Sequence, residues 1–113
     1  MPTPKRGEVW PADLGQPPER LVVILQNEAA EVIDTTIVIP LTQHMELASL
    51  ATSVPLEMGE ANLTRSYVAL CPQLRSLPVT KLRRSPVGEL PHEKLSEIER
   101  RVAFLLRLPL GRS

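Results

Sequence analysis

Two short apolar runs decide the fold of this chain: Arg20-Leu21-Val22-Val23-Ile24-Leu25-Gln26-Asn27-Glu28 and Ile37-Val38-Ile39-Pro40-Leu41-Thr42. Each run is rich in β-branched residues and is typical of a strand that is buried on both faces. Arg20 and Thr42 are the polar residues at their ends. A guanidinium and a hydroxyl held at the rims of two strands can bind a phosphodiester, because Arg offers a planar fork of donors and Thr adds another. The pair therefore points to phosphate chemistry.

The rest of the chain is divided into short apolar segments by twelve prolines, a pattern typical of a small, mainly β domain. If the first predicted strand continues beyond Pro11 to Asp13-Leu14, it is an edge or bulged strand. Residues 49–52 and 58–64 are expected to be connections. At 113 residues the chain predicts one domain, 1–113. The predicted strands cover residues 7–10, 21–25, 36–40, 53–56 and 67–70.

The hydrophobic period changes near the C-terminus. Leu95, Ile98, Val102 and Leu105 recur at spacings of three and four, which predicts an amphipathic helix that begins near Pro91 and ends before Pro109. One face of this helix should cover the sheet. Further apolar residues, at 104, 106 and 108, could reach a second protein, and we expect a homodimer.

Composition excludes several classes of protein. No run approaches the roughly 18 apolar residues that cross a membrane, and the first residues lack the apolar core of a secretory signal, so we expect a cytoplasmic protein. The single cysteine, Cys71, lies between Leu70 and Pro72 and is expected to be a buried structural residue. No His, Cys and carboxylate cluster has the spacing of a metal site, and no Gly-rich loop for a nucleotide is present, so we expect neither metal nor cofactor.

The 13 basic and 13 acidic residues give no overall charge that would attract a polyanion. The basic residues are nevertheless clustered, because no acid interrupts the span from Arg65 to Arg84. A local basic face is one interpretation of this span. The other is that some of its cations only solvate a loop, which we favour for Arg83 and Arg84.

Several fragments, in order along nearly the whole chain, resemble the MazF/PemK (Kid) toxins of bacterial toxin–antitoxin pairs. Arg6-Gly7-Glu8-Val9-Trp10 is similar to the opening Arg-Gly-(Asp/Glu)-(Val/Ile)-Trp strand of that family, and Ile39-Pro40-Leu41-Thr42 is similar to its Pro-Leu-Thr signature. The fragments are Arg6-Gly7-Glu8-Val9-Trp10, Arg20 through Glu28, Ile39-Pro40-Leu41-Thr42, Ser66-Tyr67-Val68-Ala69-Leu70 with Gln73-Leu74-Arg75-Ser76, and Lys81-Leu82 with Gly88-Glu89-Leu90.

The resemblance implies an SH3-like, strongly curved β-barrel with a C-terminal α-helix. It also implies a homodimeric toxin, an mRNA interferase, that cleaves single-stranded RNA sequence-selectively without metal and is neutralised by a cognate antitoxin. In that family the ribose 2′-OH attacks the adjacent phosphorus, leaving a 2′,3′-cyclic phosphate and a 5′-OH. By motif match, Arg20 and Thr42 take the catalytic positions, with Arg20 binding the phosphate and Thr42 donating to a non-bridging oxygen.

Other residues are candidates for supporting roles. Glu19 could orient Arg20 or accept a proton, or it is a solvated loop acid. His44 lies two residues after Thr42 and could take part in acid–base chemistry, or it is incidental. Gln73 and Arg75 either contact RNA bases and phosphate or order their own loop, and Arg65 and Lys81 belong to the basic span that could bind RNA.

The chain departs from the family pattern at Gly15-Gln16-Pro17-Pro18-Glu19, a short proline-rich loop where the family often has a longer one that covers the active site. Two alternative functions therefore stay open. One is a non-catalytic barrel toxin that inhibits a protein target, similar to the gyrase-poisoning relatives, and the other is a decayed RNA-binding relative. The RNA sequence recognised, the antitoxin and the general base are not given by the sequence.

Overall fold

The computed structural model describes residues 3–26 and 34–107. Four residues used above, at positions 27, 28, 108 and 109, lie outside this part, so the predicted helix stop at Pro109 is not tested. The described elements are β1 (Glu8–Ala12), β2 (Arg20–Ile24), β3 (Thr35–Thr42), β4 (Ser53–Leu56), β5 (Tyr67–Leu70), β6 (Arg75–Pro78), β7 (Gly88–Glu89) and α1 (His92–Leu106), with short 3-10 helices in the connections.

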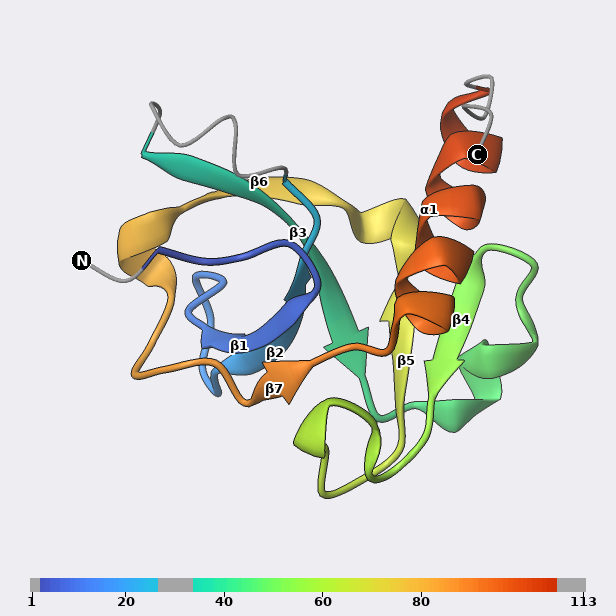
Figure 1. The fold of residues 1–113 in the computed structure, drawn as a ribbon, viewed down its shortest axis with the longest axis horizontal. Coiled ribbons are helices and arrows are strands. Elements are labelled where there is room, and N and C mark those ends of the chain that lie inside the picture. The colour runs from blue at the N-terminus through green and yellow to red at the C-terminus, as the bar shows by residue number, and fades with distance from the viewer. Residues whose placement is uncertain (1–2, 27–33, 108–113) are drawn as a thin grey trace.

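All the strands belong to one strongly curved antiparallel sheet, in the order β4-β5-β3-β2-β1-β7, with β6 also paired to β3 (Figure 1). The predicted class, a mainly β fold with a curved sheet and a C-terminal helix, is confirmed. The strands expected at 21–25, 36–40, 53–56 and 67–70 are all present within a few residues of the expected limits.

Strand β3 organises the sheet because it changes partners along its length. On one edge its residues 35–38 pair with β6 and its last two residues pair with β5, while β2 pairs with residues 38–40 on the other edge. The first edge is unpaired at Ile39 and Pro40, where the chain passes from β5 to β6. Pro40 has no N–H to donate, so it suits a position at which a ladder is interrupted.

Alternation along the strands divides the core into two clusters, one on each face of the curved sheet. Val23 and Ile39 point into the larger cluster, together with Val54, Leu56 and Ile98. Trp10, Val22, Ile24, Val38 and Leu77 form the smaller one. Residues of even number on β2 and β3 therefore share the face of the smaller cluster.

Helix α1 covers the larger cluster beside β4 and β5, as Figure 1 shows. Ile98 is fully buried, and Val102 and Leu105 are partly buried against the same cluster, as the spacing predicted. No helix in the described residues has the length and apolar composition needed to span a membrane.

Two details of the sheet differ from the prediction. Strand β1 is not an edge strand, because β2 pairs with it on one side and β7 on the other. Pro11 is tolerated there because β7 pairs only with Glu8 and Val9, and beyond them the Pro11 carbonyl accepts a hydrogen bond from Arg83 N–H at 2.9 Å. Strand β6 was not predicted, since its sequence Arg75-Ser76-Leu77-Pro78 carries little local strand signal and forms by pairing with β3.

Candidate functional site

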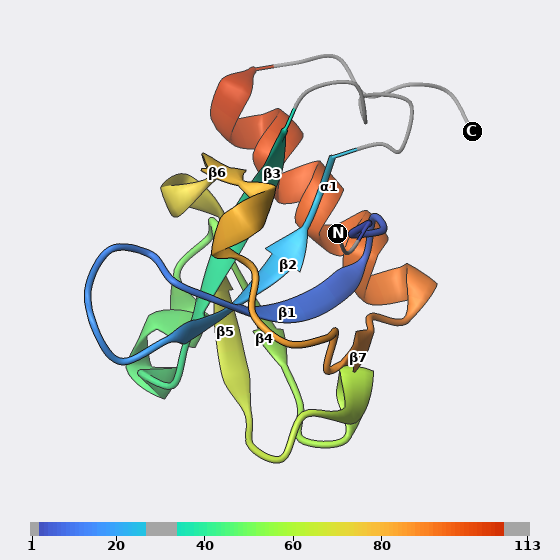
Figure 2. The same cartoon turned by 90° about the vertical axis from the view of Figure 1, so that its left-hand side faces the viewer.

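A groove of about 540 Å³ opens at the place where β3 changes partners. Pro40 lies at the gap in the ladder, Arg20 comes from the start of β2, and Gln73 and Arg75 come from the passage between β5 and β6. The loop between β1 and β2, which projects from the sheet in Figure 2, supplies the remaining wall. The lining residues are Leu14, Gly15, Gln16, Arg20, Pro40, Gln73 and Arg75.

Arg20 is exposed, and within residues 3–26 and 34–107 its guanidinium has no hydrogen-bond or ion-pair partner. Its backbone is nevertheless fixed, because Arg20 pairs with Ala12 in the ladder of β1 and β2. A cation that has no acidic neighbour and is held on a strand can accept an anionic ligand without first breaking an ion pair. Arg20 is therefore available for phosphate.

Thr42 lies on the same side of the sheet as Arg20. The register of β2 and β3 pairs Val22 with Pro40, and two residues further along each antiparallel strand it sets Arg20 opposite Thr42. The pairs between β2 and β3 end at Val22 and Pro40, so Arg20 and Thr42 lie beyond the last pair, where Thr42 is held by Val68 of β5 on the other edge of β3. Thr42 itself does not line the groove, so the convergence of the two side chains on one phosphate stays a prediction.

The Thr42 side chain is only 6% exposed, and its Oγ1 accepts a hydrogen bond from the His44 backbone N–H at 3.3 Å. This bond uses a lone pair of the hydroxyl and leaves its proton for another acceptor. The turn that follows β3 thus fixes the hydroxyl without consuming its donor.

Gln73 and Arg75 lie beside Arg20 because the chain makes one 3-10 turn, Cys71–Gln73, between β5 and β6. The pairing of Arg75 with Val38 places its side chain on the face of the smaller core cluster, which is also the face of Arg20. Both side chains are exposed and, among the described residues, neither has a polar partner. The groove is therefore lined by two unpaired guanidinium groups, of Arg20 and Arg75, and by two carboxamides, of Gln16 and Gln73.

The other cations of the basic span behave differently, because acids of the β1–β2 loop pair with them. Glu19 lies 2.7 Å from Arg84 and 3.8 Å from Arg83. Asp13 lies 3.2 Å from Arg83 and 3.8 Å from Lys81. The interpretation of Arg83 and Arg84 as mere solvating charges was wrong, since the sequence does not show that this loop folds against residues 81–84.

The Asp13 carboxylate also accepts the Gly15 N–H at 2.8 Å. This hydrogen bond is the main cause that lowers the pKa of Asp13 below its ordinary value of 3.8; burial opposes the shift, and the charges of Lys81 and Arg83 add to it. Asp13 is therefore ionised at neutral pH and holds the β1–β2 loop against the segment that follows β6.

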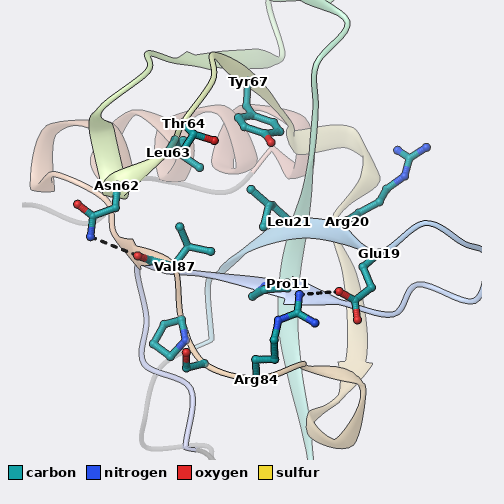
Figure 3. A pocket seen from close by; sticks show the side chains of 12 residues that line it. Pro11, Glu19, Arg20, Leu21, Asn62, Leu63, Thr64, Tyr67, Arg84 and Val87 are labelled. Atoms are coloured by element: carbon teal, nitrogen blue, oxygen red, sulfur yellow. Dashed lines mark hydrogen bonds and ion pairs between the residues drawn. The ribbon is translucent and has the colours of Figure 1, made fainter.

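The structure does not bring all the predicted site residues together. Arg20, Gln73 and Arg75 share the groove, whereas Lys81 is paired with Asp13 and Arg65 is exposed in the connection before β5. His44 is exposed, with its Nδ1 3.4 Å from Glu46 Oε1. In the close view of Figure 3 the Glu19 carboxylate turns toward Arg84, while the Arg20 side chain extends to the other side of the strand.

A second cavity, of about 460 Å³, shares Arg20 with the groove as a lining residue and is shown in Figure 3. Leu21, Leu63 and Val87 give it apolar walls, and the hydroxyl of Tyr67 points into it. Sequence reasoning missed this cavity because its walls come from three separate connections. Its lining residues are Pro11, Glu19, Arg20, Leu21, Asn62, Leu63, Thr64, Tyr67, Arg84, Ser85, Pro86 and Val87.

The buried cysteine and the possibility of a metal site complete the description of the polar groups. Cys71 is buried beneath the start of the 3-10 turn, as predicted, and burial raises the pKa of its thiol to about 11. In the part of the chain that the structure describes, no three His, Cys, Asp or Glu side chains come close enough to hold a metal ion.

Comparison with known proteins agrees with this architecture. A protein named Endoribonuclease MazF from Staphylococcus saprophyticus is 28% identical over 116 residues, which cover 96% of each chain. A mycobacterial endoribonuclease solved in complex with its cognate antitoxin has a TM-score of 0.79 at 23% identity, with 98% of this chain and 100% of that chain covered. A MazE–MazF complex from Deinococcus radiodurans gives 0.79 at 22% identity, with 96% and 100% covered.

These solved structures share the fold, and the family follows from the sequence itself. The family model described as PemK-like, MazF-like toxin of type II toxin-antitoxin system matches residues 5–106, which is most of the chain. The match includes β1, the whole sheet and helix α1, together with every predicted site residue. The chain belongs to the PemK-like, MazF-like toxin family.

Proposed function

We propose that this chain is a sequence-selective endoribonuclease toxin, an mRNA interferase, that cleaves single-stranded RNA without a metal ion. The observation that carries the proposal is the groove in which Arg20, Gln73 and Arg75 lie together with no polar partner among the described residues. A groove with unpaired guanidinium groups suits a phosphodiester backbone, and a single strand leaves bases free to be read. The relative from Staphylococcus saprophyticus, named an endoribonuclease, supports the same reaction class.

In the proposed reaction the ribose 2′-oxygen bonds to the adjacent phosphorus and the bond from phosphorus to the 5′-oxygen breaks. The 2′-OH loses its proton and the leaving 5′-oxygen gains one, so the products are a 2′,3′-cyclic phosphate and a 5′-OH. Negative charge develops on the non-bridging oxygens. Arg20 stabilises this charge, and the Thr42 hydroxyl, whose proton is not used by the His44 turn, donates to one of these oxygens.

The proton acceptor is a separate question, because a guanidinium is a poor base. Glu19 is held by Arg83 and Arg84, so it must leave these cations before it can accept a proton. His44 is exposed next to the Thr42 turn and has no such constraint beyond its contact with Glu46. We therefore assign the supporting proton transfer to His44 and a loop-holding role to Glu19.

The remaining candidate RNA-binding residues differ in whether an acidic side chain already forms an ion pair with them. We propose that Gln73 reads a base edge and Arg75 binds the phosphate next to it, since both line the groove. Arg65 follows Thr64 of the second cavity and would bind a phosphate further along the strand. Lys81 reaches RNA only in competition with Asp13 and contributes least.

In the cell the toxin would act in the cytoplasm, as a homodimer, with its groove blocked by a cognate antitoxin. The two unpaired arginines suit an acidic antitoxin segment that folds on binding. The mycobacterial and Deinococcus radiodurans neighbours were solved with their antitoxins, which supports this mode of control. Phe104, 69% exposed, and Leu106, 56% exposed, supply an apolar surface on α1 for the second copy.

The test is to incubate the purified protein with a long RNA in EDTA and to sequence the cleaved ends. We expect a small set of recurring cleavage sites with 5′-OH ends and cyclic phosphates. Intact RNA would contradict the proposal and favour a non-catalytic toxin directed at a protein such as DNA gyrase. Binding of RNA without cleavage would favour a decayed relative.

A further inference from the structure

We propose that the second cavity, beside Tyr67, holds the base of one of the two nucleotides that flank the scissile phosphate. The inference rests on the proposed RNA cleavage and adds a recognition site to it. Arg20 lines both this cavity and the first groove, so its side chain forms the wall that they share. An RNA strand whose phosphate is bound by Arg20 can therefore place a neighbouring nucleotide in this cavity.

The shape and surface of the cavity suit a planar heterocycle. Its volume of about 460 Å³ lies within the usual range of small-molecule sites, roughly 300–1,000 Å³. Leu21, Leu63 and Val87 offer apolar contact to a ring, and hydroxyls of Tyr67 and Thr64 lie at one side of it (Figure 3). Neither hydroxyl has a hydrogen-bond partner among the described residues, so both are free to meet the edge of a base.

Tyr67 is the aromatic residue that this role requires. The chain has one Trp, one Tyr and one Phe. Trp10 is buried in the smaller core cluster and Phe104 lies on the surface of α1. Tyr67 alone of the three lines a described cavity next to Arg20, and protein aromatics commonly stack on unpaired RNA bases.

Charge distinguishes a base from the other possible occupants. The one cation in the cavity besides Arg20 is Arg84, and its guanidinium is neutralised by Glu19 at 2.7 Å. A phosphate or an acidic antitoxin segment would gain more from the first groove, where Arg20 and Arg75 are unpaired. A neutral base has no such preference for free cations and suits the apolar walls that Leu21, Leu63 and Val87 provide.

The cavity is also preformed. Asn62 Nδ2 donates to the Val87 carbonyl at 3.2 Å, and Val87 N–H donates to the Val9 carbonyl at 2.7 Å. These bonds join the connection before β5 to the segment that enters β7, which are two facing walls. A site with fixed walls loses little entropy on binding and can discriminate between bases.

The experiment compares cleavage of a randomised single-stranded RNA library by the wild type, Tyr67→Phe, Tyr67→Ala and Thr64→Val, with end sequencing. We expect all of them to cut, with the base preference relaxed at one position next to the scissile bond. Tyr67→Ala should also lower kcat/KM about tenfold through KM, as expected for the loss of one stacking contact. Gln73→Ala should relax a different position, and Thr52→Val, outside both cavities, is the matched control.

Each other outcome has a defined meaning. A wild type that does not cut RNA removes the proposed function itself. If the wild type cuts and Tyr67→Ala shows an unchanged sequence profile and an unchanged melting curve, the base site is wrong. If Tyr67→Ala instead weakens binding of an acidic antitoxin peptide while the RNA profile stays the same, the cavity belongs to the antitoxin and the base site is again wrong.

Discussion

At the scale of single residues, the proposed cleavage depends most on Arg20. Its side chain is exposed and unpaired in the described structure, so its removal should leave the fold intact. We expect Arg20→Ala to lower the cleavage rate by at least roughly 100- to 1,000-fold, since one donor to a developing oxyanion is lost. Arg20→Lys keeps the charge without the planar fork, so its cleavage rate should lie between those of the wild type and Arg20→Ala.

The measurement is single-turnover cleavage of a defined RNA, with thermal unfolding as the check on the fold. Arg100→Ala, at an exposed position of α1, is the matched control and should cut like the wild type. Digestion of RNA by Arg20→Ala at the wild-type rate would remove the mechanism.

Cys71 gives a second prediction at this scale. Burial raises the pKa of its thiol to about 11 from an ordinary value of 9.0, so the thiol is protonated and unreactive at pH 8. Ellman's reagent should label the native protein far more slowly than the protein in guanidinium chloride. A thiol whose folded pKa is raised stabilises the fold fully below the unfolded pKa, so this contribution is lost as the pH rises above about 9. Rapid labelling of the native protein would show that the site opens.

At the scale of elements, the local sequence pattern was enough to predict some strands and the helix, and was insufficient to predict others. Helix α1 was predicted because its apolar residues repeat with the helical period, and strands β2 and β3 because each is a short continuous apolar run rich in β-branched residues. Strand β6 depends on its partner, as it forms only against residues 35–38 of β3. The same distinction applies to the site: Arg20 and Thr42 end two recognisable strands, whereas Tyr67 and Thr64 acquire a role only from the way that distant connections meet.

The β1–β2 loop gives the prediction that belongs to this scale. Its acids hold it to Lys81, Arg83 and Arg84, and the pKa of Asp13 is lowered mainly by the Gly15 N–H. A carboxylate with a lowered folded pKa stabilises the protein above its unfolded pKa, and this stability is lost as the pH falls through the folded value. Asp13→Asn should therefore melt slightly below the wild type at pH 7 and low salt.

The difference between the two proteins should shrink in high salt, which screens exposed charges, and should disappear well below pH 3.8. Thermal unfolding across pH and salt measures both effects. Asp34→Asn changes an exposed acid that precedes β3 and serves as the control. A melting temperature that does not depend on Asp13 at any pH would show that the ion pairs do not hold the loop.

At the scale of the whole molecule, the proposed homodimer depends on the exposed apolar side chains of α1. Phe104 and Leu106 are largely exposed on α1 in the single chain. In the proposed homodimer they are covered, so a charge at Phe104 should separate the copies. We expect Phe104→Glu to have half the mass of the wild type by light scattering, with an unchanged melting profile at high dilution.

Arg100→Glu, on the same helix, changes charge without removing an apolar contact and is the control. A wild type that is monomeric, or a Phe104→Glu protein that has the wild-type mass, would contradict the assignment of this surface.

The exchange of partner strands along β3 also determines how much of the chain must be synthesised before the groove can form. Its walls come from β2, from the middle of β3 and from the passage into β6, so it is assembled only after β6 has paired with β3. A nascent chain on the ribosome therefore has no groove until residues up to Pro78 have emerged from the exit tunnel. In the proposed function, a chain built in this way cannot cut the messenger from which it is being translated until about two thirds of its own length has left the ribosome.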